Sequence, residues 1–146
     1  MKFRVIDFET TGSEKDLAAG IPVEICEIGW TDLDDAGRVH QPVAHLVNPN
    51  MPMPLAGRGI HHISDGMLAD AMTPSEAKAL LLAGMEPGDS FCAHNSAFER
   101  LFFSGGAHAW ICTMRCAQHL WEDAPDHKNQ TLRYWLNLEE EFEWPE

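Results

Sequence analysis

The chain has 146 residues, 45% of them hydrophobic and 9% aromatic, which is enough to bury one core and excludes disorder as the default state. Its net charge of −13 argues against tight binding to long nucleic-acid duplexes, because phosphate recognition normally uses basic surface. No apolar run approaches the roughly 18 residues of a membrane helix. Met1-Lys2-Phe3 leads directly into a strand, so we expect no membrane span and no secretory leader.

The first predicted strand, residues 4–8, runs into a Thr-Thr-Gly turn. Asp7 and Glu9 stand at i and i+2, where the side chains of a strand point to one face. Two neighbouring carboxylates repel each other, and a hard divalent cation such as Mg²⁺ or Mn²⁺ removes that repulsion when it lies between them. The alternative interpretation is a strand end that carries two solvated acids.

The next part of the chain predicts a hairpin between two loops. Residues 13–22 are expected to form a loop, and residues 27–31 and 39–47 two strands joined by a turn at 32–37. Residues 48–59, with three prolines, are expected to be an irregular surface segment.

A helix is predicted from Pro74 to about Met85, since Thr73 and a proline at the first helical position are start signals. The side chains expected to be buried are those of Ala77, Leu80, Leu81 and Gly84. Pro87-Gly88-Asp89 then turns the chain into a short apolar strand that ends at Cys92.

A polar turn after that strand introduces another predicted helix. Asn95 is a preferred N-cap residue, and the helical pattern that follows places Phe98, Leu101 and Phe102 on one stripe expected to be buried. Glu99 lies beside this stripe, one turn into the helix. An exposed helix acid is the alternative interpretation of Glu99.

Residues 109–112 are expected to form a short buried strand, and Thr113 can cap a helix that reaches Trp121. Cys112, Cys116 and His119 fall at i, i+4 and i+7 of this segment, so a zinc face is the alternative to ordinary half-buried cysteines. The four cysteines have no paired spacing, which indicates a reducing cytoplasm. The glutamates among residues 139–146 are expected to be a solvated terminus.

Three strands followed by alternating helices and strands predict an α/β fold, a mixed sheet flanked by helices. The first strand and its turn resemble the first motif of the DEDD-type 3′–5′ exonucleases, the superfamily of the proofreading epsilon subunit of bacterial DNA polymerase III. That motif, Asp-x-Glu-Thr-Thr-Gly, is filled without a gap by Asp7, Glu9, Thr10, Thr11 and Gly12.

Two later blocks extend the resemblance. The family's second motif, His-Asn-x-x-Phe-Asp, is matched from His94 to Glu99, with glutamate in place of the final aspartate. Glu99 keeps the charge and adds one methylene. A His-Gly-Ile segment near the family's substrate cleft is matched weakly, and only His61 carries over, because His62 stands where glycine is common. A polar loop is the alternative there.

The family's closing motif, a C-terminal His-x-x-x-x-Asp or Tyr-x-x-x-Asp, has no match. The resemblance continues through residues 129–136, the chain ends at Glu146, and no aspartate follows His127 at four or five residues. We therefore expect one exonuclease-like domain, residues 1–146, that lacks its C-terminal helix and last motif. Alone it is expected to be inactive or weak, with apolar sheet surface covered by a second copy or a partner chain.

The resemblance implies a ribonuclease H-like fold and a metal-dependent 3′–5′ exonuclease that acts on DNA or RNA. Two Mg²⁺ or Mn²⁺ ions would be held by Asp7, Glu9 and Glu99. The residues implied on the substrate side are Thr10, Thr11, His61 and Asn95. The expected partner is nucleic acid with a free 3′ end, single-stranded or short.

A different class of function stays open. A catalytically inactive domain of the same fold, acting as a binding or interaction module, is favoured by the missing last motif, by Glu99 and by the negative charge. An unrelated hydrolase or a zinc protein is the third interpretation.

Overall fold

The structure is a computed structural model, and residues 1–138 are described here; the predicted solvated terminus at 139–146 lies outside them. The elements in chain order are β1 (Lys2–Thr10), α1 (Glu14–Ala18), β2 (Ile25–Asp34), β3 (Val43–Leu46), α2 (Leu55–His61), α3 (Asp65–Leu68), α4 (Pro74–Leu82), β4 (Ser90–Ala93), α5 (Ser96–Phe102), β5 (Ala109–Cys112), α6 (Thr113–Leu120) and α7 (Asn129–Trp135).

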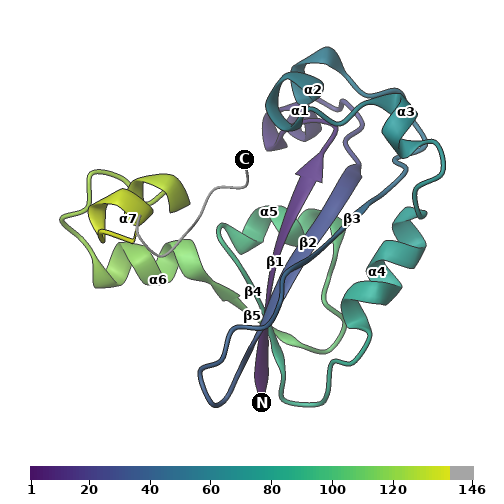
Figure 1. Ribbon diagram of the computed structural model, residues 1–146. Helices are drawn as coiled ribbons and strands as arrows, with labels where there is room; N and C mark the ends of the chain where they lie inside the picture. The colour runs from purple at the N-terminus through teal and green to yellow at the C-terminus, as the bar shows by residue number, and fades with distance from the viewer. Residues whose placement is uncertain (139–146) are drawn as a thin grey trace.

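The strands form one five-stranded mixed sheet in the order β3-β2-β1-β4-β5. β1 pairs antiparallel with β2 and parallel with β4, so it lies at the centre of the sheet. Figure 1 shows α4 on one side of the sheet, α6 and α7 on the other, and α1 and α2 near the tip of β1. The predicted mixed sheet flanked by helices is confirmed. Within residues 1–138, no helix is long and apolar enough to cross a membrane.

β1 has two different faces because the side chains of a strand alternate. Arg4, Ile6 and Phe8 are buried, whereas Asp7 is exposed and Glu9 is half-buried. The buried face packs into the main core with α4. Members of this core are Ile6, Phe8, Ile25, Ile28, Val47, Ala77, Leu81, Phe91, Ala93 and Phe103. The opposite face therefore carries the two carboxylates.

A buried arginine ties β1 to β2 and to the end of α4. Arg4 is 5% exposed, and its Nε and Nη2 donate to the two carboxylate oxygens of Asp32 at 2.7 and 2.8 Å. Its Nη1 donates to the carbonyl oxygens of Leu81 and Ala83 at 2.9 Å each. The guanidinium also lies 5.5 Å from the ring centroid of Trp30. The hydrogen bonds from Arg4 hold the pKa of Asp32 below its ordinary value.

Two of the predicted loops contain helices. α1 forms within residues 13–22 because Ser13 and Asp16 build a capping box, in which the Ser13 backbone N–H donates to Asp16 Oδ2 at 2.7 Å. α2 begins inside the segment 48–59, although glycines normally disfavour a helix. Its Gly57 is buried, and an added Cβ would lie 3.2 Å from His61 Nε2 and 3.4 Å from the Thr11 carbonyl oxygen, so close packing favours glycine here.

Other element boundaries also differ from the prediction. β2 extends to Asp34 instead of ending at 31. The second arm of the hairpin shrinks to Val43–Leu46, because Pro42 has no N–H for the ladder. α4 ends at Leu82, and Gly84 adopts a φ of +71° in an exposed turn rather than a buried helix. Leu80 is half-buried.

α5 has the predicted position but a different buried face. Leu101 is 55% exposed, Phe98 is only half-buried, and the buried residues of the helix are Ser96 and Glu99. The predicted apolar stripe is therefore wrong, and the nearby core anchor is Phe103, which follows the helix. Asn95 occupies the N-cap position with a φ of 81° but makes no side-chain cap bond.

The fifth strand and the helix after it also differ from the prediction. β5 is half-buried at the edge of the sheet rather than fully buried. Thr113 is the first residue of α6, and Cys112 takes the N-cap position without a side-chain bond.

We predict that Asp32→Asn lowers the free energy of unfolding by about 3 kcal/mol at pH 7, since it leaves the buried Arg4 charge unpaired. The native pKa of Asp32 is lowered, so the stability it contributes is present above its ordinary pKa of 3.8 and is lost as pH falls through the native value. Urea unfolding between pH 7 and pH 3 should therefore show the difference from wild type shrinking at acidic pH. Asp35→Asn, at the exposed end of the same hairpin, is the control, and equal losses in both variants would contradict this account.

Candidate functional site

Asp7 faces a hollow on the side of the sheet opposite the main core. Its partner across the β1–β2 ladder is Gly29, which has no side chain to fill that space. The hollow has a volume of about 560 Å³, and residues of β1, β2 and β3 form its floor. His94, Thr113 and Asn129 line the opposite wall. Asp7 is thus accessible from this hollow.

Glu9 opens into a second hollow, of about 480 Å³, between the end of β1 and α2. Apolar side chains dominate its wall, among them Ile21, Met51 and Ile60. His61 also lines it, and its ring is fixed by neighbours: Nδ1 accepts the N–H of Ile63 at 3.2 Å. A neutral ring then carries its proton on Nε2, which lies 3.8 Å from Cys26 Sγ.

Glu99 is a buried carboxylate with one oxygen that has no hydrogen-bond partner. Its side chain reaches the interior from α5 with an exposure of 3%, and its Oε2 makes no hydrogen bond. Burial raises the pKa of Glu99 to about 7, and the charge of Asp7 adds to this shift. The interpretation of Glu99 as an exposed helix acid is therefore wrong.

The three carboxylates share one electrostatic environment. Partial removal from water raises the pKa of Asp7, and the charge of His94 partly offsets this. The pKa of Glu9 is raised by partial burial and then by the charge of Asp7. Asp7 is thus the charge that couples Glu9, on its own strand, to Glu99 on α5.

The carboxylates do not form one three-ligand group. Among residues 1–138, no three histidine, cysteine, aspartate or glutamate side chains are arranged to hold a single metal ion. This also applies to the zinc interpretation, for which Cys116 and His119 are both exposed. Mg²⁺ is commonly bound by one or two carboxylates together with water and substrate phosphate. The pairs centred on Asp7 match that smaller requirement, and their role as ligands stays a prediction.

The two threonines of the first motif make internal hydrogen bonds. Thr11 donates its backbone N–H to the Glu24 carbonyl oxygen at 2.9 Å, and its Oγ1 accepts the N–H of Glu24 at 3.0 Å. Thr10 Oγ1 donates to the Gly12 carbonyl oxygen at 2.6 Å. These bonds hold the turn beside Glu9. Direct contact of either threonine with a nucleotide stays a prediction, as it does for Asn95.

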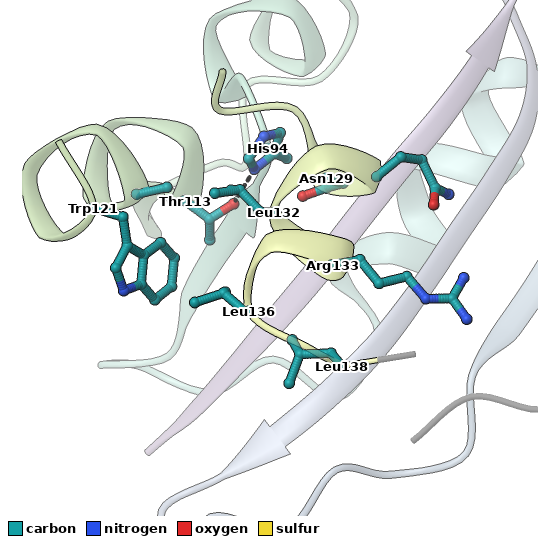
Figure 2. A pocket seen from close by; sticks show the side chains of 10 residues that line it. His94, Thr113, Trp121, Asn129, Leu132, Arg133, Leu136 and Leu138 are labelled. Atoms are coloured by element: carbon teal, nitrogen blue, oxygen red, sulfur yellow. Dashed lines mark hydrogen bonds between the residues drawn. The ribbon is translucent and has the colours of Figure 1, made fainter. Parts of the chain in front are cut away.

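Sequence reasoning gave no role to His94, which holds the wall opposite Asp7 together. His94 Nε2 must donate to the His127 carbonyl oxygen, 2.6 Å away, because a carbonyl only accepts. Its Nδ1 lies 3.1 Å from Thr113 Oγ1, the contact dashed in Figure 2. His94 thereby joins the end of β4 to α6 and to the segment before α7. The signal in the sequence was its place beside Asn95.

His94 also borders a third hollow, between α6 and α7, with a volume of about 430 Å³. Figure 2 shows Trp121, Leu132 and Leu136 along it. Its wall is largely apolar and includes Leu138, the last described residue. The expected partner chain over this C-terminal region stays a prediction.

The sequence of this chain is similar to those of known exonucleases. The sequence profile of the RNase_T family, described as exonuclease, matches residues 5–105. Exodeoxyribonuclease 10 of Escherichia coli (strain K12) is 33% identical over 118 residues, which cover 81% of this chain and 48% of that protein. The chain thus spans about half the length of the curated relatives it matches.

Solved structures agree with the sequence match. Exonuclease X in complex with 5′ overhanging duplex DNA superposes with a TM-score of 0.76 at 30% identity, covering 92% of this chain and 73% of that one. Exonuclease I of E. coli in complex with a dT13 oligonucleotide has the same fold, with a TM-score of 0.69, 14% identity, and coverage of 91% and 35%. The predicted ribonuclease H-like fold and the resemblance to 3′–5′ exonucleases are confirmed. This chain belongs to the RNase_T exonuclease family.

Proposed function

We propose that this chain carries the metal-ligating carboxylates of a 3′–5′ exonuclease that hydrolyses DNA or RNA from free 3′ ends. Asp7, Glu9 and Glu99 are the ligands for two Mg²⁺ or Mn²⁺ ions. The observation that carries the proposal is the buried, unpartnered Oε2 of Glu99, whose charge interacts with that of Asp7.

The donor set fits a hard divalent cation. A buried carboxylate is costly unless it is paired, and no salt bridge joins Asp7, Glu9 or Glu99 to a basic side chain within residues 1–138. Oxygen ligands of this kind are the ones that Mg²⁺ and Mn²⁺ prefer. A cation between Asp7 and Glu99 would remove the repulsion between the two carboxylates. It would also coordinate the unpartnered Oε2 of Glu99.

Each residue has a definite task in this proposal. A divalent ion, when bound, lowers the pKa of a coordinated water and neutralises charge on the phosphate. Asp7 approaches that position from the sheet and Glu99 approaches it from α5. Glu9 lies between the face of β1 that carries Asp7 and the apolar hollow beside α2. Met51 and Ile60 of this hollow offer a surface for a terminal nucleobase.

The substrate class follows from charge and from the relatives. With a net charge of −13 the chain lacks the basic surface that long duplexes need, so short or single-stranded 3′ ends fit best. The two solved relatives described above are complexes with an overhanging duplex and with an oligonucleotide. The competing function is an inactive binding module of the same fold, and the first experiment below separates the two.

We predict that Asp7→Asn lowers hydrolysis by at least about 100-fold, because it removes the anchor shared by both carboxylate pairs. The measurement is release of nucleotides from the 3′ end of a 5′-labelled single-stranded oligonucleotide in Mn²⁺, at high protein concentration. Glu122→Gln, an exposed acid after α6, should match wild type. No hydrolysis by this chain or by a C-terminally extended form, with oligonucleotide binding retained in both, would favour the binding module instead.

We also predict that Glu99→Gln stabilises the metal-free protein at pH 8, by up to about 3 kcal/mol. Burial disfavours the ionised form of Glu99, so its native pKa of about 7 lies above the ordinary value of 4.5. The free energy of unfolding of wild type therefore falls as pH rises from 4.5 through 7. In EDTA the variant and wild type should converge near pH 4.5. Added Mn²⁺ should raise the melting temperature of wild type at pH 8 more than that of the variant. A Glu99→Gln variant that is less stable than wild type in EDTA at pH 8 would contradict this prediction.

A further inference from the structure

Asn129 is the residue of α7 that lines the hollow beside Asp7. Together with His94 and Thr113 it forms the wall opposite Asp7. Asn129 is the first residue of the helix, its side chain is exposed, and within residues 1–138 its amide makes no hydrogen bond. The proposed function gives this amide no task.

The side chains that the structure describes on the floor of this hollow do not offer it a free hydrogen-bond donor. The Thr31 hydroxyl donates to a backbone carbonyl oxygen at 2.7 Å. Trp30 also borders the hollow, but its indole packs against the main core on the other face of the sheet. The floor therefore presents the carboxylate of Asp7, which accepts hydrogen bonds, among small and apolar residues.

His94 and Thr113, the other two residues of the opposite wall, are bonded to each other. His94 Nε2 donates to the His127 carbonyl oxygen, so a neutral ring leaves Nδ1 as the acceptor for the Thr113 hydroxyl, 3.1 Å away (Figure 2). Both donors of this pair are thus in use. Among the described side chains that line the hollow, the amide of Asn129 is therefore the donor that remains free.

The backbone around Asn129 is held in place by its own hydrogen bonds. His127 accepts from His94 at 2.6 Å through its carbonyl oxygen, and its Nε2 lies 3.0 Å from the Trp121 carbonyl oxygen, to which it donates. Asp126 Oδ1 accepts the N–H of Lys128 at 2.9 Å. These bonds fix the segment that leads into α7, so the amide of Asn129 is presented to the hollow from an ordered backbone.

A neutral donor opposite Asp7 suits a phosphate group. Phosphate oxygens accept hydrogen bonds, and the amide of asparagine supplies two N–H donors without a charge. A lysine or arginine at this place could pair with the Asp7 carboxylate and would compete with a divalent cation for it. A phosphodiester has two non-bridging oxygens, so one can face the Asp7 side of the hollow while the other faces Asn129.

We propose that Asn129 is a substrate-binding residue, whose amide donates to a non-bridging oxygen of the phosphodiester next to the 3′ end. The inference rests on the proposed function, which places that phosphodiester beside Asp7. A phosphate contact carries no base information. Asn129 therefore contributes equally to binding of every sequence.

The experiment measures binding of a 5′-fluorescein-labelled single-stranded oligonucleotide to the full 146-residue chain by fluorescence anisotropy. Ca²⁺, which also takes oxygen ligands, replaces Mg²⁺ to limit hydrolysis. Asn129→Ala should bind about tenfold more weakly than wild type, the effect of losing one hydrogen bond to a charged group. Asn129→Gln, which keeps the amide, should recover part of the loss. Gln130→Ala is the matched control, because this neighbouring exposed amide lines the hollow between α6 and α7 instead.

A second oligonucleotide tests the phosphate contact itself. It carries an uncharged methylphosphonate at its 3′-terminal linkage, in which a methyl group replaces one non-bridging oxygen. Wild type and Asn129→Ala should bind this oligonucleotide equally, because the charged acceptor is gone from both complexes. The same loss with both oligonucleotides would overturn the phosphate contact. The melting temperature of Asn129→Ala should equal that of wild type, since the side chain is exposed.

Two further outcomes separate this inference from the proposed function. Unchanged affinity of Asn129→Ala for the ordinary oligonucleotide, with Ca²⁺-dependent binding lost in Asp7→Asn, would overturn the role of Asn129 alone. Binding by wild type that is the same in Ca²⁺ and in EDTA would overturn both.

Discussion

The alternation of β1 is the constraint on which the rest of the structure depends. One strand must bury Arg4, Ile6 and Phe8 on one face and present Asp7 and Glu9 on the other. The buried face is fixed by the core and by the four hydrogen bonds of Arg4, which reach β2 and the end of α4. A slip of one residue would bury both carboxylates and expose the core residues. The site is therefore held in register by packing on the opposite side of the sheet.

The carboxylates of Asp7, Glu9 and Glu99 lie in an electrostatically unfavourable environment that the fold alone does not relieve. Glu99 is taken out of water with its Oε2 unpartnered. Loss of water raises the pKa of Asp7, and loss of water together with the charge of Asp7 raises the pKa of Glu9. In an ordinary core such a group would be replaced by an apolar residue. Its presence here, on the helix that follows β4 and under the influence of the Asp7 charge on β1, is typical of a functional site.

The fold and the first motif could be predicted from sequence because both depend on local patterns. Alternation located β1, and the turn before Ser90 located β4. The buried face of α5 could not be predicted, since a stripe of Phe98, Leu101 and Phe102 looks apolar while the tertiary contacts bury Glu99 instead.

The glutamate at position 99 illustrates how one methylene alters the geometry of the same chemistry. α5 starts from Asn95, which adopts a left-handed conformation with a φ of 81°, and the helix contacts β4 and β5. The side chain of Glu99, one methylene longer than aspartate, is buried, and the charge of Asp7 acts on its carboxylate. The hollow beside Asp7 is correspondingly open, because Gly29 adds no side chain to its floor. Glu99 does not line this hollow, so Asp7 has an open side beside Gly29 and a second side on which the charge of Glu99 acts.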